Sequence, residues 1–88
     1  MLAEFTIYSK DGCSYCDRAK ALCEANSRTY TELKLGRDIE HDALLDTIQH
    51  YGHGRTMPLI VCNDDGHGNQ FRIGGYTELS EYLKQETK

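Results

Sequence analysis

Two cysteines separated by two residues are the part of the sequence best suited to chemistry. Cys13 and Cys16 can close a disulfide or bind a metal, and both uses require thiolates. The segment Ala3 to Tyr8 is typical of a strand and Asp17 to Asn26 of a helix. The pair is therefore predicted at a strand-to-helix turn, where unpaired N–H groups and the helix dipole favour an ionised sulfur and lower its pKa.

The two thiols are not equivalent at such a turn. Cys13 is predicted at or just before the first helical residue, whereas Cys16 lies one turn further in and is expected to be covered. Cys13 is therefore the candidate nucleophile, and Cys16 the thiol that resolves the resulting mixed disulfide. Lys10 can place a positive charge near the same sulfur, and Tyr15 can shield it.

A zinc site is the alternative use of this spacing, and it needs two further ligands. The available candidates are His50, His53, Cys62 and His67. The sequence contains no second CxxC pair, and the predicted elements place these candidates apart, so redox chemistry is the preferred interpretation. Cys23 and Cys62 are expected to be inert thiols of the core.

Length and composition limit the classes of protein. The 88 residues, 39% hydrophobic and 27% charged, predict a single globular domain spanning 1–88. A net charge of -4 argues against a general nucleic-acid or anionic-membrane surface. The sequence has no secretory pattern and no run near the roughly 20 apolar residues of a membrane span. A cytoplasmic, reducing location is therefore expected.

Two elements are predicted between the first helix and the proline. The segment Thr29 to Leu35 has the composition of a strand, and its polar residues Glu32 and Lys34 suggest an edge. Asp38 is predicted to cap a helix that ends at Gly52. The inner face of that helix is predicted to carry Ala43, Leu44, Ile48 and Tyr51.

The last third predicts a hairpin and a helix. Residues 59–62 form a continuous apolar run, and the turn-rich segment 63–69 leads to alternating Phe71 and Ile73. Thr77 is predicted to cap a helix whose inner face carries Leu79, Tyr82 and Leu83. The order β-α-β-α-β-β-α predicts an α/β fold with one four-stranded mixed sheet and helices on both faces.

Three motifs together resemble the glutaredoxin family of the thioredoxin-fold superfamily. They are Tyr8-Ser9-Lys10 before the CxxC pair, Thr56-Met57-Pro58, and Gly74-Gly75-Tyr76, and the resemblance covers nearly the whole chain. It implies the thioredoxin-like fold, dithiol exchange, and glutathione as reductant without a tightly bound cofactor.

The resemblance also implies a role for individual residues. Cys13 matches the nucleophile and Cys16 the resolving thiol. Pro58 matches the family's cis-proline, which would present the Met57 backbone to a substrate peptide by β-augmentation. The implied glutathione contacts are Lys10, Tyr15, Thr56, Met57, Pro58, Gly75, Tyr76 and Thr77.

The chain departs from the family pattern at the end that receives the γ-glutamyl group. Thr77 stands where an aspartate is usual, and the neighbouring Glu78 is the candidate substitute. N–H groups at the start of the last helix are expected to help at this end. Arg37 and Arg55 are the candidate partners of the glycine carboxylate.

Two variant residues suggest narrower roles. Met57 in Thr-Met-Pro and the short length are similar to bacteriophage glutaredoxins, which donate electrons to ribonucleotide reductase. The resemblance therefore implies a monomer that reduces protein disulfides and glutathione mixed disulfides, with that enzyme as a partner. Ser14 is similar to dithiol glutaredoxins in which Cys13 and glutathione hold a [2Fe–2S] cluster between two protomers. That alternative is a scaffold or sensor, and a third is a reductant fed by thioredoxin reductase.

Overall fold

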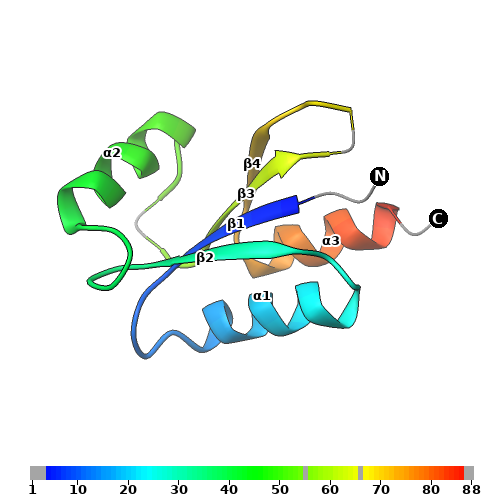
Figure 1. Ribbon diagram of the computed structural model, residues 1–88, viewed down its shortest axis with the longest axis horizontal. Helices are drawn as coiled ribbons and strands as arrows, with labels where there is room; N and C mark the ends of the chain where they lie inside the picture. Colours follow the sequence, from blue (N-terminus) through cyan, green and yellow to red (C-terminus); the bar gives the residue numbers. More distant parts are fainter. Residues whose placement is uncertain (1–3, 55, 66, 87–88) are drawn as a thin grey trace.

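The computed structural model describes residues 4–54, 56–65 and 67–86. Ala3, Arg55 and Gly66, which entered the predictions, lie outside these residues. The elements in chain order are β1 (Glu4–Ser9), α1 (Ser14–Ala25), β2 (Tyr30–Lys34), α2 (His41–Tyr51), β3 (Leu59–Asp64), β4 (Phe71–Gly74) and α3 (Tyr76–Glu86), as Figure 1 shows. The predicted order is confirmed.

The strands form one mixed sheet in the order β2-β1-β3-β4. β1 pairs with β2 in parallel and with β3 antiparallel, and β3 pairs antiparallel with β4. β2 therefore lies at an edge, as its polar residues predicted.

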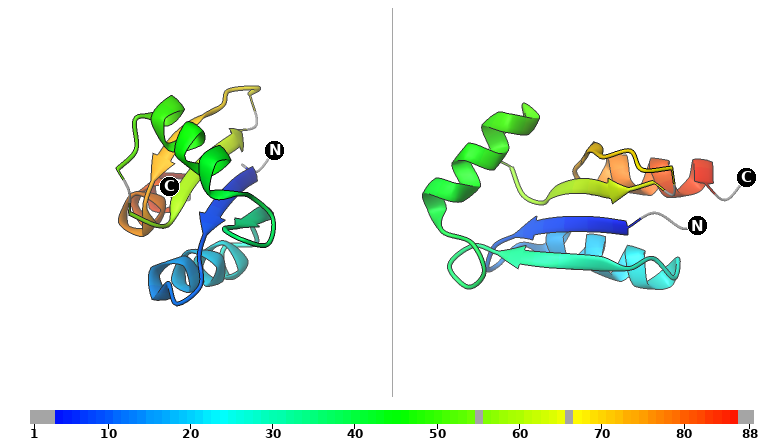
Figure 2. Two further views of the ribbon diagram at one scale, coloured as in Figure 1. Left: turned by 90° about the vertical axis from the view of Figure 1, so that its left-hand side faces the viewer. Right: turned by 45° about the horizontal axis from the view of Figure 1, so that its top comes forward.

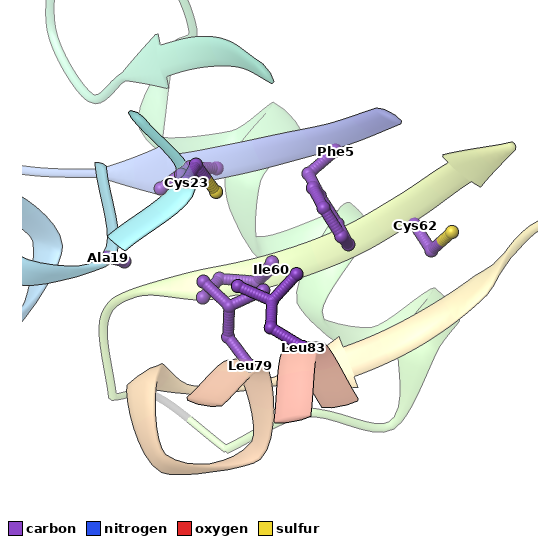
Figure 3. Packing of buried hydrophobic residues seen from close by; sticks show 8 residues of the cluster. Phe5, Ala19, Cys23, Ile60, Cys62, Leu79 and Leu83 are labelled. Carbon is purple, nitrogen blue, oxygen red and sulfur yellow. The ribbon is translucent and has the colours of Figure 1, made fainter. Parts of the chain in front are cut away.

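Helices cover both faces of the sheet, α1 and α3 on one and α2 on the other (Figures 1 and 2). On the first face Ala19, Cys23, Leu79 and Leu83 of the helices pack against strand residues that include Phe5, as Figure 3 shows. The second face buries Leu44, Ile48, Leu59 and Val61. Because β3 contributes to both clusters, its apolar residues form an uninterrupted run.

Helix α1 begins at Ser14, three residues before the predicted Asp17. Cys13 is its N-cap residue, with extended backbone angles, and its sulfur accepts a hydrogen bond from the N–H of Cys16 at 3.1 Å. The sulfur thus takes the place of the usual capping oxygen. Asn26, predicted to break this helix, is its C-cap.

Asp38 does not cap α2, so that prediction was wrong. The helix begins at His41 with Glu40 at the N-cap position. Residues 36–39 instead form a turn in which the Asp38 carboxylate accepts the N–H of Lys34 at 3.0 Å. Ala43, predicted on the inner face, is exposed. Gly52 ends the helix with φ 65°, as predicted.

Thr77 does not cap α3, because the helix already begins at Tyr76. The N–H of Gly75 donates to Oε1 of Glu78 at 2.7 Å. The Glu78 carboxylate thus accepts the N–H of the residue before the helix, as in half of a capping box, whereas a capping threonine hydroxyl would accept an N–H inside the first turn.

The sheet register brings three loops to one end of the molecule. Tyr8 near the end of β1 pairs with Leu59 at the start of β3, and Ile60 pairs with Gly74 at the end of β4. The loop before α1, the loop before β3 and the start of α3 therefore meet at this end. Within the described ranges, no helix has the length and apolar character needed to span a membrane.

Candidate redox site

Cys13 and Cys16 are joined by a disulfide at the start of α1, with their Cα atoms 5.3 Å apart. Cys13 is half-buried, whereas Cys16 is only 1% exposed. An external thiol or disulfide therefore has access to Cys13 first. In the reduced protein, the N–H of Cys16 that points at the Cys13 sulfur would stabilise a thiolate there.

The backbone of Met57 lies beside the same sulfur. Its carbonyl oxygen is 3.7 Å from Sγ of Cys13. The bond between Met57 and Pro58 is cis, and Pro58 is buried. The predicted proline isomer is confirmed, and the loop before β3 borders the disulfide.

A groove of about 200 Å³ opens beside the disulfide, and we call it the polar groove. Its lining residues are Tyr15, Thr56, Met57, Pro58, Gly75, Tyr76, Thr77 and Glu78. Tyr15 is 54% exposed. Its ring centroid lies 6.1 Å from that of Tyr76, and the Arg18 guanidinium carbon lies 5.2 Å from the Tyr15 centroid. The structure thus brings together seven of the eight glutathione contacts that the resemblance implies, all except Lys10.

The backbone of the glycine pair shapes one end of the polar groove. Gly74 has φ 121°, a conformation that L-residues rarely adopt. A Cβ atom there would lie 2.9 Å from Oε1 of Glu78. The sequence suggested that N–H groups at the start of α3 are free to bind a ligand. The N–H of Gly75 is not free, because it donates to the Glu78 carboxylate. Glu78 therefore sets the charge at this end.

Two of the predicted basic residues, Lys10 and Arg37, lie elsewhere. Lys10 lines a second groove, which shares Met57 with the polar groove. The Arg37 guanidinium is 2.7 Å from the Asp38 carboxylate and 3.3 Å from that of Glu32. Neither lines the polar groove.

A hydrogen-bonded network supports the loop that carries Cys13. The hydroxyl of Ser9, which is 1% exposed, donates to Glu32 at 2.6 Å, and the Lys20 ammonium donates to the same carboxylate at 3.0 Å. The Ser9 hydrogen bond, with that of Lys20, holds the pKa of Glu32 below its usual value. The network joins the end of β1 to β2 and α1, so it fixes where the CxxC segment begins.

The other two cysteines are buried thiols. Burial raises the pKa of Cys23 to about 11, so this thiol stays protonated near neutral pH. Among the described residues, no three His, Cys, Asp or Glu side chains form a group that could hold a metal ion.

A thioredoxin-like fold with an accessible CxxC disulfide defines a thiol–disulfide oxidoreductase. A family model described as glutaredoxin matches residues 5–67. The chain belongs to the glutaredoxin family. No curated protein matches the chain.

Solved structures of glutaredoxins resemble the chain over nearly its whole length. The dithiolic glutaredoxin 2-C-Grx1 of Trypanosoma brucei brucei is 33% identical, with a TM-score of 0.70, over 98% of this chain and 81% of that one. A buckwheat glutaredoxin–glutathione complex is 26% identical, with a TM-score of 0.74, over 96% and 71%. Glutaredoxin 1 of Francisella tularensis, complexed with cacodylate, shares the fold at 23% identity and TM-score 0.70, over 97% and 96%.

Sequence reasoning missed two features of the site. The cation above Tyr15 comes from Arg18, and a helical spacing of three residues could have suggested it. The second groove depends on α2, whose residues are far from the motifs in sequence. Its leucines gave only the signal of an ordinary amphipathic helix.

Proposed function

We propose that the protein is a cytoplasmic, glutathione-dependent oxidoreductase that reduces protein disulfides and glutathione mixed disulfides. The observation that carries this proposal is the Cys13–Cys16 disulfide bordering a groove that contains the glutathione contacts expected from the sequence. The buckwheat glutaredoxin that resembles this chain is a complex with glutathione, which supports glutathione as the ligand here.

The reaction begins with the reduced pair. The Cys13 thiolate attacks a substrate sulfur, the substrate disulfide breaks, and the leaving thiolate takes the electron pair and a proton. Cys16 then attacks the Cys13 sulfur, which releases the second substrate thiol and leaves the intramolecular disulfide. Two glutathione molecules reduce this disulfide and become glutathione disulfide.

Glutathione would bind along the loop before β3. Its cysteine backbone would pair with the Met57 backbone next to Cys13, in the manner of an added strand. The γ-glutamyl end would then lie in the polar groove near Tyr76, Thr77 and Glu78. The ammonium of the γ-glutamyl group would form an ion pair with the Glu78 carboxylate.

Turnover of a glutathione mixed disulfide tests this function. Cys13→Ser should reduce turnover to the uncatalysed rate, because serine is not ionised near pH 7. The matched control is Cys23→Ala, which removes a buried thiol whose pKa of about 11 keeps it unreactive. A Cys13→Ser protein that keeps its activity would contradict the proposal.

The physiological partner we propose is a disulfide-containing enzyme such as ribonucleotide reductase, served by a monomer. Reduction by glutathione with glutathione reductase, compared with reduction by thioredoxin reductase, identifies the electron source.

The cluster-scaffold alternative would use Cys13 as the only protein ligand from each chain. Anaerobic purification with iron and glutathione should give a colourless monomer, and a dimer with iron and labile sulfide would favour the alternative.

A further inference from the structure

The second groove beside Met57 is apolar, and we call it the apolar groove. Its volume is about 210 Å³, and its lining residues are Lys10, Leu35, His41, Leu44, Leu45, Ile48 and Met57. Met57 also lines the polar groove, so the two grooves share one residue, whose carbonyl lies 3.7 Å from the Cys13 sulfur. A peptide bonded to Cys13 and paired with the Met57 backbone would therefore lie next to both grooves.

Leu45 is an apolar residue of α2 that does not belong to the hydrophobic core. Leu44 and Ile48 of the same helix are 5% and 7% exposed and pack against β3. Leu45 is half-buried, lines the apolar groove, and belongs to neither core cluster of the described residues. Its side chain therefore presents apolar surface to whatever enters the groove.

Lys10 provides a charge at the same groove. It is exposed and makes no ion pair or hydrogen bond within the described part of the chain. Lys20 and Lys34, in contrast, are bound to Glu32 and Asp11 at 3.0 and 2.7 Å. An incoming carboxylate would therefore meet an unpaired cation beside apolar surface.

The size and position of the apolar groove suit a peptide side chain. Pockets for whole small molecules typically measure about 300–1,000 Å³, more than the 210 Å³ found here. In β-augmentation, main-chain hydrogen bonds supply affinity and side-chain pockets supply specificity. An extended peptide covers about 3.3 Å per residue, so a side chain within two residues of the reacting cysteine lies close to Met57.

We propose that the apolar groove is a specificity site for protein disulfide substrates. The occupant is an extended segment with a bulky aliphatic residue within two positions of its reactive cysteine and an Asp or Glu that meets Lys10. This inference rests on the proposed function, because it requires Cys13 to attack the cysteine sulfur of that segment.

Short peptides test the inference with the full, reduced chain. Each peptide carries one cysteine as a mixed disulfide with a chromogenic aromatic thiol, which leaves with the electron pair when Cys13 attacks the peptide sulfur. Leucine is placed one or two positions before or after the cysteine, with serine elsewhere, and Asp or Lys is added beyond it. The second-order rate constant for release of the aromatic thiol is measured for each peptide, and for a glutathione mixed disulfide.

The best leucine peptide should react about tenfold faster than the all-serine peptide, which is the effect expected of one filled apolar pocket. Its Asp version should react faster than its Lys version, by a ratio that falls as salt is added. Leu45→Ser should lower the leucine preference to about threefold or less. The matched control is Leu33→Ser, because Leu33 is a half-buried leucine that lines neither groove.

The outcomes separate this inference from the proposed function. If the wild type reduces the glutathione mixed disulfide but shows no leucine preference, the specificity site is wrong and the proposed function stands. The same holds if Leu45→Ser keeps the full preference, or if Leu33→Ser loses it equally. If the wild type reacts with no disulfide at all, both proposals fail.

Discussion

The two grooves beside Met57 are built in different ways. The polar groove is lined by Tyr15 of α1, by the loop before β3, and by Gly75 with the first turn of α3, and it includes Met57, whose backbone carbonyl lies 3.7 Å from the Cys13 sulfur. The apolar groove is formed mainly by side chains of α2 and of residues next to β1 and β2. Backbone groups suit one common ligand, whereas side chains select among ligands by size and charge.

This difference suggests a division of tasks around one sulfur. Glutathione would use the polar groove in every catalytic cycle, and protein substrates would be distinguished in the apolar groove. Because the two grooves share only Met57, whose carbonyl lies 3.7 Å from the Cys13 sulfur, a substitution elsewhere in one groove should change one class of substrate. A substitution in the shared framework should change both classes equally.

Removal of Cys16 should give the largest separation between the two substrate classes. Cys16→Ser should lower turnover of a protein disulfide by at least about 100-fold, because an external thiol then replaces a positioned intramolecular one. Turnover of a glutathione mixed disulfide should change much less, since a second glutathione can resolve the intermediate. Steady-state rates with the two substrates check this prediction. Equal losses would show that both classes depend on Cys16.

Gly74→Ala should damage the polar groove. A left-handed φ of 121° is strained for alanine, and the new Cβ would lie 2.9 Å from Oε1 of Glu78. We expect a loss of about 1–3 kcal/mol in the free energy of unfolding and a higher KM for glutathione. Denaturant unfolding and kinetics measure both effects.

The control for this change is Gly54→Ala. A Cβ at Gly54 would meet nothing within 4 Å, and its φ lies outside the left-handed range. Its unfolding free energy should stay within about 0.5 kcal/mol of the wild type. The leucine preference of the apolar groove should survive in both variants. Its loss in Gly74→Ala alone would mean that the grooves are not independent.

Tyr15→Ala should have a smaller effect, limited to the polar groove. Tyr15 is 54% exposed and its ring lies 6.1 Å from that of Tyr76 at a tilt of 43°, so its removal takes away one wall without opening the core. Aromatic contacts of this kind contribute about 0.5–1.5 kcal/mol, which corresponds to a two- to tenfold rise in the KM for glutathione. Tyr15→Phe keeps the ring and should stay near the wild-type value. A tenfold rise in the KM for glutathione in Tyr15→Phe would show that the hydroxyl, and not the ring, makes the contact.

The polar groove could be predicted from the sequence because its residues lie in three short motifs. The segments 13–16, 56–58 and 74–76 are each a short contiguous stretch of sequence. The sheet then brings the motifs together, and alternation and apolar runs predicted the order of its strands along the chain. Most residues that line this half of the site were therefore evident from local sequence, whereas its cation, Arg18, was not predicted.

The caps and the apolar groove could not be predicted in the same way. Asp38 and Thr77 are good capping residues, but the turn at 36–39 and the Glu78 carboxylate decided the helix starts. Leu45 has the composition of an ordinary helix face, and only the packing of Leu44 and Ile48 leaves it outside the core. Which residue caps a helix, and which leucine packs into the core, depends on contacts between residues distant in sequence.

Glu32→Gln should give the smallest effect, and it should act equally on both substrate classes. Hydrogen bonds from Ser9 and Lys20 lower the pKa of Glu32 in the folded protein, so its carboxylate stabilises the fold above the unfolded-chain value of about 4.3. That contribution is lost as the pH falls through the lower, folded-state pKa. We expect the variant to be about 1 kcal/mol less stable at pH 7, with the difference shrinking below about pH 4.

Unfolding free energies from pH 3 to pH 7 measure this difference, with Asp46→Asn as the control because Asp46 is an exposed carboxylate on α2. The network holds the end of β1, from which both Lys10 and Cys13 follow. Any loss of activity in Glu32→Gln should therefore leave the ratio of leucine-peptide to glutathione-substrate rates unchanged. A change in that ratio would show that Glu32 supports one groove more than the other, and would contradict its role as a support of both.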